Sequence, residues 1–238
     1  MVEPIYDRLV PYYDAVYGFK DYSAEAAYLS EVIRRQQPSA RSLLDVACGT
    51  GRHLEHLSRE FEVEGLDVNS GFLGIARRRL PGVPLHEADM TDFELGRVFD
   101  VVTILSSSIT LVRTVENMER AVRATGRHLA PGGLLLVEPL WEPDAHREGE
   151  VTLNVVDEPE LKIAWMYVNE RVGDLAHWKN HFLVGTPSGV ESFVEVHEAG
   201  LFTDTQYRTA FASAGLDVVE WDAEGPRLRG LYVARNPG

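Results

Sequence analysis

Hydrophobic positions in the first 139 residues follow two patterns in turn. Short continuous apolar runs, the length of buried strands, are separated by longer stretches whose apolar positions recur at helical spacing. The predicted strands comprise residues 42–46, 63–66, 84–88, 100–105 and 134–138. The predicted helices comprise residues 24–35, 52–60, 70–80 and 114–129. This alternation of strand and helix predicts a doubly wound α/β domain built on a parallel sheet.

The pattern changes to a period of two after Pro139. Within residues 151–199, for example, Ile163, Trp165 and Tyr167 alternate with other residues, as they would on one face of a strand. Proline and glycine turns separate several such segments. We therefore expect a small antiparallel sheet inserted into the α/β domain.

Beyond residue 200 the helical pattern returns. Residues 203–214 read as a helix that begins after Thr203 as N-cap and ends before Gly215. Residues 218–219 and 231–234 read as the last two strands of the main sheet. The predicted division is an α/β domain of residues 1–139 and 200–238 with an inserted sheet of residues 140–199.

The N-terminal segment is rich in aromatic side chains. They are Tyr6, Tyr12, Tyr13, Tyr17 and Phe19. We expect a helix that closes over the functional site as a lid, and packing of this helix on the sheet is compatible with that role.

The composition is that of an ordinary globular protein, with 45% hydrophobic and 25% charged residues in a chain of 238. The single cysteine, Cys48, allows no internal disulfide. No apolar run approaches the about 20 residues that span a bilayer. The first residues lack the basic and then apolar profile of a signal peptide. We therefore expect a cytoplasmic protein.

The charge balance argues against two classes of partner. Lys and Arg number 23 against 37 Asp and Glu, a net charge of −14, which repels both nucleic acid and anionic membrane surfaces. A small anionic ligand remains compatible where Arg or Lys neutralises it locally. The basic run at residues 77–79 lies late in a predicted helix, where a solvated helix end is favoured over a binding patch.

The first strand runs into a glycine turn, and two acidic residues follow the next two strands. Gly49 and Gly51 allow close approach of a ligand, but the dinucleotide fingerprint would need a third glycine where Leu54 stands. Asp67 ends the second strand, where a carboxylate can accept hydrogen bonds from two ribose hydroxyls. Asp89 ends the third, next to an apolar methionine. Together they favour a nucleoside ligand over a plain tight turn.

These motifs resemble those of the class I S-adenosylmethionine-dependent methyltransferases. The matching residues are Asp45-Val46-Ala47-Cys48-Gly49-Thr50-Gly51, Asp67, Asp89-Met90 and Pro131-Gly132-Gly133. The resemblance implies an α/β fold: a doubly wound, mostly parallel seven-stranded sheet with its last-formed strand antiparallel, here with the inserted antiparallel sheet. It also implies S-adenosylmethionine as cofactor, bound by the glycine turn and the two acids.

A narrower resemblance covers nearly the whole chain. It is similar to the nucleotide-linked amino-sugar N-methyltransferases of the desosamine and mycaminose pathways. The stretches that carry it are SLLDVACGTG, HLEHL, ARRRLPGVPLHEADMTDFELGR, the serine run at 106–108, VEPLWEP, the helix end AFASAGL and the Gly225-Pro226 pair before Arg229. In that family the inserted sheet serves dimerisation and the substrate pocket, so we expect a homodimer. Trp165, Tyr167, Trp178 and Phe182 on these strands are of types enriched at interface cores.

The resemblance also implies site residues. Those expected to bind the cofactor are Tyr13, Lys20, Asp45, Ala47, Gly49, Thr50, Gly51, Asp67, Val68, Asp89, Met90 and Ser106. Those expected to bind the substrate are Tyr17, Trp141, His181, Arg227 and Arg229. Contacts with the substrate amine are expected from Tyr6, Ser107 and Ser108. Arg229 is the first choice for a diphosphate, because its planar guanidinium fits phosphate oxygens.

The chain departs from the family at one chemically important position. Leu111 stands where relatives often carry a histidine shortly after the serine run. Methyl transfer to an amine is a one-step displacement that proximity and alignment can drive, so we expect little or no help from a base. A hydroxyl would usually need a base or a metal. No metal site is expected, since His177 and His181 are more often ordinary sheet residues.

Three functions are compatible with these patterns. The first is N-methylation of a deoxyamino sugar carried on thymidine diphosphate, as part of natural-product biosynthesis. The second is O- or N-methylation of another small metabolite. The third is a non-catalytic, methyltransferase-like partner subunit, which the intact glycine turn and acidic residues disfavour.

Overall fold

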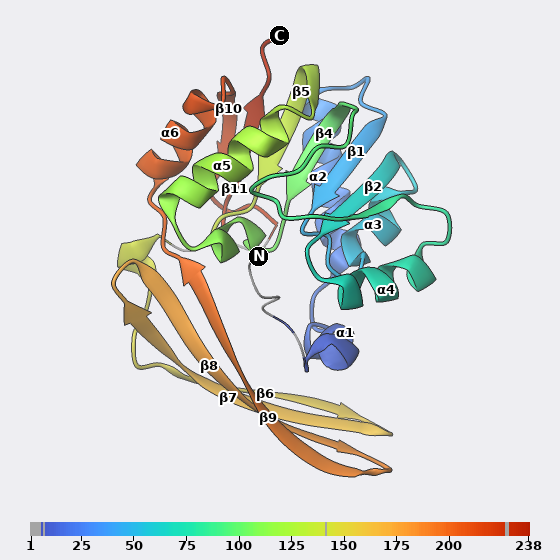
Figure 1. The fold of residues 1–238 in the computed structure, drawn as a ribbon, viewed down its shortest axis with the longest axis vertical. Helices are drawn as coiled ribbons and strands as arrows, with labels where there is room; N and C mark the ends of the chain where they lie inside the picture. The colour runs from blue at the N-terminus through green and yellow to red at the C-terminus, as the bar shows by residue number, and fades with distance from the viewer. Residues whose placement is uncertain (1–5, 7, 141, 227–228) are drawn as a thin grey trace.

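The computed structural model describes residues 6, 8–140, 142–226 and 229–238, which form two sheets (Figure 1). The larger sheet has seven strands in the order β10-β11-β5-β4-β1-β2-β3. Its strands are β1 (Ser42–Val46), β2 (Glu62–Asp67), β3 (Leu85–Glu87), β4 (Phe99–Ile104), β5 (Leu129–Val137), β10 (Asp217–Asp222) and β11 (Leu231–Arg235). β11 runs antiparallel to both of its neighbours, β10 and β5, and the other adjacent pairs are parallel, which confirms the predicted doubly wound, mostly parallel sheet.

Helices cover both faces of this sheet. They are α1 (Tyr13–Val16), α2 (Tyr22–Gln36), α3 (Arg52–Leu57), α4 (Ser70–Arg79), α5 (Val115–Gly126) and α6 (Asp204–Ser213). Short 3₁₀ turns are η1 (Val10–Tyr12), η2 (Ser108–Val112) and η3 (Pro143–Ala145). Leu44, Val102 and Leu135 face α5 and α6, whereas their neighbours along each strand face α2, α3 and α4. Because both faces are covered, the strands read as continuous apolar runs.

The predicted helices 24–35, 70–80 and 203–214 match the observed helices to within two residues at each end. Their N-caps are side chains of the expected kind: Asp21 accepts from the backbone of α2, Asn69 from α4 and Thr203 from α6. At Thr203 the cap is a reciprocal capping box with Gln206, which stabilises the first turn.

Two predicted boundaries are wrong. The helix expected to reach residue 60 ends at Leu57, and β5 begins at Leu129, inside the helix predicted to end there. The Pro131-Gly132-Gly133 segment lies within β5, at the point where the pairing with β4 shifts register. A Cβ at Gly133 would come within 2.8 Å of the Ala130 carbonyl oxygen, so the chain can bulge there only without a side chain.

The inserted segment forms a four-stranded antiparallel sheet, as predicted. Its strands are β6 (Val151–Glu158), β7 (Leu161–Val172), β8 (Leu175–Thr186) and β9 (Gly189–Gly200). They pair in sequence order and form a long curved layer beside the α/β body (Figure 1). One face of this sheet packs against the N-terminal segment, with Leu9 and Val16 buried against Trp165, Phe182 and Phe193.

This packing corrects the expectation that the aromatic residues of the inserted sheet form a dimer interface. Trp165 and Phe182 are buried inside the subunit at 7% and 4% exposure, and Tyr167 and Trp178 line the cavity described below. All four rings therefore lie on the inner face of the sheet, away from its exposed face. The other face of the same sheet carries exposed aliphatic side chains instead.

Candidate active site

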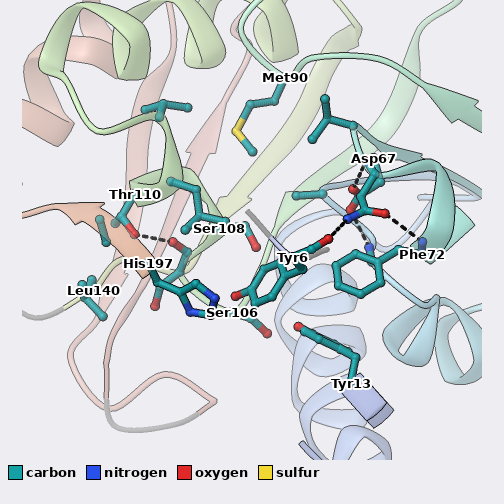
Figure 2. Close-up of a pocket in the computed structure, with 18 of the residues that line it drawn as sticks. Tyr6, Tyr13, Asp67, Phe72, Met90, Ser106, Ser108, Thr110, Leu140 and His197 are labelled. Carbon is teal, nitrogen blue, oxygen red and sulfur yellow. Dashed lines mark hydrogen bonds between the residues drawn. The ribbon is translucent and has the colours of Figure 1, made fainter. Parts of the chain in front are cut away.

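A cavity of about 660 Å³ lies between the two sheets (Figure 2). Its walls are the C-terminal ends of β1, β2, β3 and β4, the inner face of the four-stranded sheet and the N-terminal segment. Parallel α/β sheets bind ligands at this end of their strands. The volume is within the range of small-molecule sites.

The glycine turn and Asp67 form one rigid unit in this cavity. Ala47, Gly49 and Gly51 all have positive φ, and the turn leads into α3. Asp67 is 7% exposed, and its two oxygens accept hydrogen bonds from the backbone N–H groups of Gly49 and Asn69, each at 2.8 Å. Burial raises the pKa of Asp67, and these N–H donors oppose that rise. Each carboxylate oxygen keeps a second lone pair for a ligand hydroxyl.

Asp89 stands in a second turn, at the end of β3. Its Oδ1 accepts from both the N–H and the hydroxyl of Thr91, each at 2.8 Å, which fixes the carboxylate at the cavity wall. Met90, beside it, packs partly against the main core and also lines the cavity. The pair offers an acceptor for an amine and an apolar surface for a flat ring.

The serine run after β4 is a strained turn. Ser106 and Ser107 have φ values of 54° and 60°, a region that non-glycine residues rarely adopt. The N–H of Ser106 donates to the buried Glu138 at 2.7 Å, and the hydroxyl of Ser107 donates to the Pro139 carbonyl at 2.7 Å. Arg229 donates to the Ser107 hydroxyl at 3.3 Å. The turn thus presents Ser106, Ser107 and Ser108 to the cavity in a fixed geometry.

A buried cluster of charged side chains contacts this turn through the Ser106 hydroxyl. Lys20 donates to the Ser106 hydroxyl at 2.6 Å and lies 3.2 Å from Glu25, which in turn bonds His53 at 2.8 Å. Burial acts to raise the pKa of Glu25, but the bonds from His53 and Lys20 hold that pKa below its ordinary value. Glu25 therefore stays charged and holds the Lys20 ammonium at the cavity wall.

The N-terminal segment closes one side of the cavity. The carbonyl of Tyr6 accepts from the Asn69 side chain at 2.7 Å, next to the ribose-type carboxylate. The Tyr6 ring packs on Tyr13 and Phe72, each with a centroid distance of 5.4 Å. Burial raises the pKa of both tyrosines well above the ordinary value, so both phenols stay neutral. At the other end, the backbone N–H of Leu9 donates to Glu195 of β9 at 2.8 Å.

Arg79 corrects one expectation about the basic run. Arg77 and Arg78 are exposed, as a solvated helix end requires. Arg79 instead donates to the Thr50 carbonyl and forms an ion pair with Asp14 at 2.5 Å. Asp14 also accepts from the Thr50 hydroxyl at 2.6 Å. These bonds fasten α1 to the glycine turn.

Most of the site residues expected from the sequence line this one cavity. They are Tyr6, Tyr13, Tyr17, Lys20, Ala47, Gly49, Asp67, Val68, Asp89, Met90, Ser106, Ser107, Ser108 and Arg229. Trp141 and Arg227 lie outside the described residues. Asp45, Thr50 and Gly51 lie beneath the cavity wall: Asp45 is 2% exposed and accepts from Thr103 at 2.7 Å, and Thr50 is bonded to Asp14.

His181 is placed away from the cavity. Strand residues alternate between faces, and on β8 the inward set contains Trp178, Asn180 and Phe182. His181 is therefore on the outer face, exposed and opposite Met166 and Val194. The geometry does not support it as a substrate contact within this cavity.

The sequence reasoning missed the polar side chains that the second sheet contributes. Asn154, Asn169, Asn180 and His197 all line the cavity. The period of two was the available signal, but it assigns no face until the register and the packing partner are known.

Cavity chemistry fits S-adenosylmethionine, the cofactor implied by the resemblance. A carboxylate for ribose hydroxyls, a carboxylate for an exocyclic amine and an apolar methionine follow one another along the strand ends. The described residues contain no group of three or more His, Cys, Asp or Glu arranged to hold a metal ion. No described helix is long and apolar enough to cross a membrane.

Comparison with known proteins gives the same picture. Residues 43–133 match a family model described as a methyltransferase domain. The dTDP-3-amino-3,4,6-trideoxy-alpha-D-glucopyranose N,N-dimethyltransferase of Streptomyces venezuelae is 43% identical over 216 residues, which cover 90% of this chain and 91% of that protein.

Two solved structures are similar over nearly the whole chain. The crystal structure of Streptomyces venezuelae DesVI has a TM-score of 0.91 and 41% identity, and the match covers 96% of this chain and 98% of that one. The S-adenosylmethionine-bound structure of CalS10, an amino pentose methyltransferase from Micromonospora echinaspora, has a TM-score of 0.87 and 38% identity, covering 99% and 100%.

Proposed function

We propose that this chain, which belongs to the S-adenosylmethionine-dependent sugar N-methyltransferases, methylates the amine of a deoxyamino sugar linked to thymidine diphosphate. The observation that carries the proposal is that three relatives about 40% identical, matched over nine-tenths of the chain, are named as N,N-dimethyltransferases of dTDP-linked amino sugars. The cavity adds the chemistry such a reaction needs. It is a single cavity of about 660 Å³, with nucleoside-type acceptors at one end and asparagine side chains of the inserted sheet at the other.

The cofactor, S-adenosylmethionine, supplies an electrophilic methyl group on a sulfonium. Asp67 is placed to accept from the ribose hydroxyls, and Asp89 and Met90 are placed to hold the adenine. Backbone and Thr91 donors fix the two carboxylates, so a cofactor held by them would have its reacting methyl at a defined position relative to the serine turn. Such alignment lowers the barrier of an in-line displacement without a chemical step by the protein.

The substrate anchor in this proposal is Arg229. It lines the cavity and reaches the Ser107 hydroxyl, so a diphosphate held by its guanidinium lies next to the serine turn. Arg120 also lines the cavity and adds positive charge in a protein whose net charge is −14, whereas Arg113 is ion-paired with Glu198 at 3.1 Å. The sugar amine then lies among Ser107, Ser108 and Tyr6.

We further propose a homodimer formed through the outer face of the four-stranded sheet. Exposed aliphatic side chains lie in register across its strands: Leu153 is opposite Met166, and His181 lies between Met166 and Val194. The other exposed members are Val151, Val155, Val168, Leu183, Val190 and Val196. A contiguous apolar face of this kind is typical of an interaction surface.

We propose a separate role for the part of the chain that builds each sheet. Residues 1–139 and 200–238 hold the cofactor, with the N-terminal segment as a lid, and residues 140–199 complete the substrate pocket and the dimer. We place the activity in the cytoplasm and in antibiotic biosynthesis. Both ligands are charged metabolites of the cell interior, and CalS10 is described as involved in calicheamicin biosynthesis.

A product assay tests the proposal. The purified protein is incubated with S-adenosylmethionine and a panel of thymidine diphosphate sugars that includes 3-amino hexoses and amino pentoses. Mass spectrometry should show the gain of one or two methyl groups on at least one amino sugar. Binding of S-adenosylhomocysteine with no methylated sugar in the panel would contradict the proposed substrate class.

A further inference from the structure

We propose that Glu138 is a positioning residue, which holds the serine turn at 106–108 in its strained conformation and thereby aligns the substrate amine. The inference rests on the proposed N-methylation. In-line transfer depends on the alignment of the amine with the methyl group, and a misplacement of about 1 Å can cost about 100-fold in rate. Glu138 is fully buried and does not line the cavity, so it would act only through the turn.

Ser106 and Ser107 form the strained part of this turn. Their φ values of 54° and 60° lie in the left-handed region, which disfavours every residue with a Cβ. Two such residues in succession persist only where the surrounding structure over-determines them. Backbone strain of this kind is concentrated at functional sites, and both serines line the cavity.

Two consecutive residues that follow β5 constrain the turn. Glu138 Oε2 accepts from the Ser106 N–H at 2.7 Å, and the Pro139 carbonyl accepts from the Ser107 hydroxyl at 2.7 Å. The Glu138 N–H donates to the Ile104 carbonyl at 3.0 Å, so the main chain of Glu138 is itself fixed at the end of β4. A hydrogen bond to a carboxylate is stronger than one to a neutral acceptor. Glu138 therefore makes the stronger of these two bonds to the turn.

The Glu138 carboxylate is unfavourable for folding. The residue is 0% exposed, and its Oε1 has no hydrogen-bond partner among the described residues. A buried carboxylate with an unpaired oxygen destabilises the folded state. An apolar side chain of similar volume would remove that penalty. Folding stability therefore does not account for a glutamate at this position, whereas the bond to the strained turn does.

The other bonds to the turn engage different atoms. Lys20 donates to the Ser106 hydroxyl at 2.6 Å. Thr110 donates both its N–H and its hydroxyl to the Ser107 carbonyl, at 3.0 and 2.7 Å. Neither contact involves the Ser106 N–H, which points to Glu138. Loss of the Glu138 carboxylate would therefore leave this N–H without its acceptor and allow the turn to relax.

Glu64 provides a matched control on the same sheet. It is also a buried glutamate, 6% exposed, but it lies in β2 and both of its oxygens have partners. Oε1 accepts from Arg97, and Oε2 lies 2.7 Å from His86 Nε2. Glu64 does not line the cavity. Loss of its charge should therefore lower stability without changing the reaction.

The first experiment compares Glu138→Gln, Glu138→Met and Glu64→Gln with an amino sugar that the wild type methylates. We expect kcat to fall about 10-fold in Glu138→Gln, which keeps a neutral acceptor, and about 100-fold in Glu138→Met, which keeps none. KM for S-adenosylmethionine should change little. Glu138→Met should not melt below wild type, because the buried charge and the backbone strain are both released. Glu64→Gln should melt lower and keep the wild-type kcat.

A double-mutant cycle separates positioning from a general structural role. Glycine adopts a φ of 54° without strain, so Ser106→Gly reduces the need for the Glu138 bond. The loss of kcat caused by Glu138→Gln should therefore be smaller in the Ser106→Gly background than in the wild type. Equal losses in both backgrounds would overturn the inference. Wild-type kcat in both Glu138 variants would also overturn it, as would a melting temperature of Glu138→Met that falls like that of Glu64→Gln.

Hydrogen exchange at the Ser106 amide tests the bond without any substrate. The amide should exchange at least about tenfold faster in Glu138→Met than in the wild type, because it has lost its acceptor. Equal exchange rates would contradict the role of Glu138. A wild-type protein that methylates no amine would instead refute the proposed function, and the exchange rates would still decide whether Glu138 holds the turn.

Discussion

Three aspartates at or near the strand ends differ in their capacity to bind a ligand, because they differ in burial and in hydrogen-bond partners. Asp67 and Asp89 face the cavity and accept from backbone N–H groups, so each is oriented and has acceptor capacity left for a ligand. Asp45, in β1, is almost fully buried and bonds the Thr103 hydroxyl. Burial raises the pKa of Asp45 to about 7, the bond from Thr103 lowers it, and the nearby charge of Asp67 raises it.

The assignment of Asp67 predicts a loss of cofactor affinity on truncation. Each hydrogen bond to a charged acceptor contributes up to about 1.5–3 kcal/mol. Asp67→Ala should therefore weaken binding of S-adenosylhomocysteine at least about tenfold in isothermal calorimetry. Circular dichroism provides the control for an intact fold. Unchanged affinity in a folded variant would remove the basis for this assignment.

The raised pKa of Asp45 predicts how stability depends on pH. In the unfolded chain an aspartate titrates near pH 4, so between about pH 4 and pH 7 the folded protein holds a proton that the unfolded chain has lost. The contribution of Asp45 to the free energy of unfolding therefore falls as the pH rises from about 4 to about 7. The Asp45→Asn variant has no such titration, so its free energy of unfolding should not fall in this way. Relative to wild type, its free energy of unfolding should rise by up to about 4 kcal/mol between pH 4 and pH 7. Parallel stability curves in chemical denaturation would contradict this.

The assignment of Arg229 predicts a selective effect on one substrate. Arg229→Ala should raise KM for the nucleotide sugar by about 10- to 100-fold and leave KM for S-adenosylmethionine nearly unchanged, because it removes binding of one ligand only. Arg229→Lys, which keeps the charge but not the planar fork, should lie between the two. Equal changes in both KM values would indicate a disturbed cavity instead.

Local signals predicted some site residues and missed others for a definite reason. Asp67 and Asp89 follow apolar runs directly, and the end of a parallel strand is a defined place in the fold. His197 and His181 both lie on strands of the inserted sheet. A period of two does not reveal which of them faces inward, because that depends on the register of β8 and β9 and on the N-terminal segment packed against them.

At the scale of elements, the order of strands and helices followed from the hydrophobic pattern, whereas some boundaries did not. The patterned interiors of α2, α4 and α6 are long, and capping side chains mark their starts. The start of β5 depends on a bulge at Gly132 and Gly133, where the N–H of Gly132 donates to Asn236 near the end of the chain at 2.8 Å. A contact between such distant residues leaves no trace in the local pattern.

The outer face of the inserted sheet predicts the assembly state. Leu153→Lys places a charge within the exposed aliphatic face, opposite Met166, and should convert the proposed dimer to a monomer in light scattering. Glu160→Lys, in the turn between β6 and β7, adds the same charged residue outside that face and should leave the dimer intact. A wild-type protein that is monomeric at micromolar concentration would contradict the proposed interface.

At the scale of the whole molecule, the cavity exists because three distant parts of the chain meet. The strand ends of the α/β domain provide the proposed nucleoside site, the inserted sheet provides a wall with several asparagine side chains, and the N-terminal segment contacts both. Asp14 and Asn69 fasten this segment to the α/β domain, and Glu191 and Glu195 fasten it to β9. The protein is acidic overall, and Arg113 is ion-paired with Glu198 at 3.1 Å. Arg120 and Arg229, which also line the cavity, would therefore supply the positive charge that the proposed diphosphate substrate needs.

A competition between two acceptors tests the central claim most directly. The protein is given S-adenosylmethionine with equal amounts of a thymidine diphosphate amino sugar that it accepts and the matching sugar with a hydroxyl in place of the amine. The products are then quantified by mass spectrometry. An N-methyltransferase must place its methyl groups on the amine and leave the hydroxyl sugar unchanged, because alignment is enough for an amine, whereas a hydroxyl usually needs a base or a metal. The described residues contain no group of three or more side chains arranged to hold a metal ion. Methylation of the hydroxyl sugar in preference to the amino sugar would contradict the account.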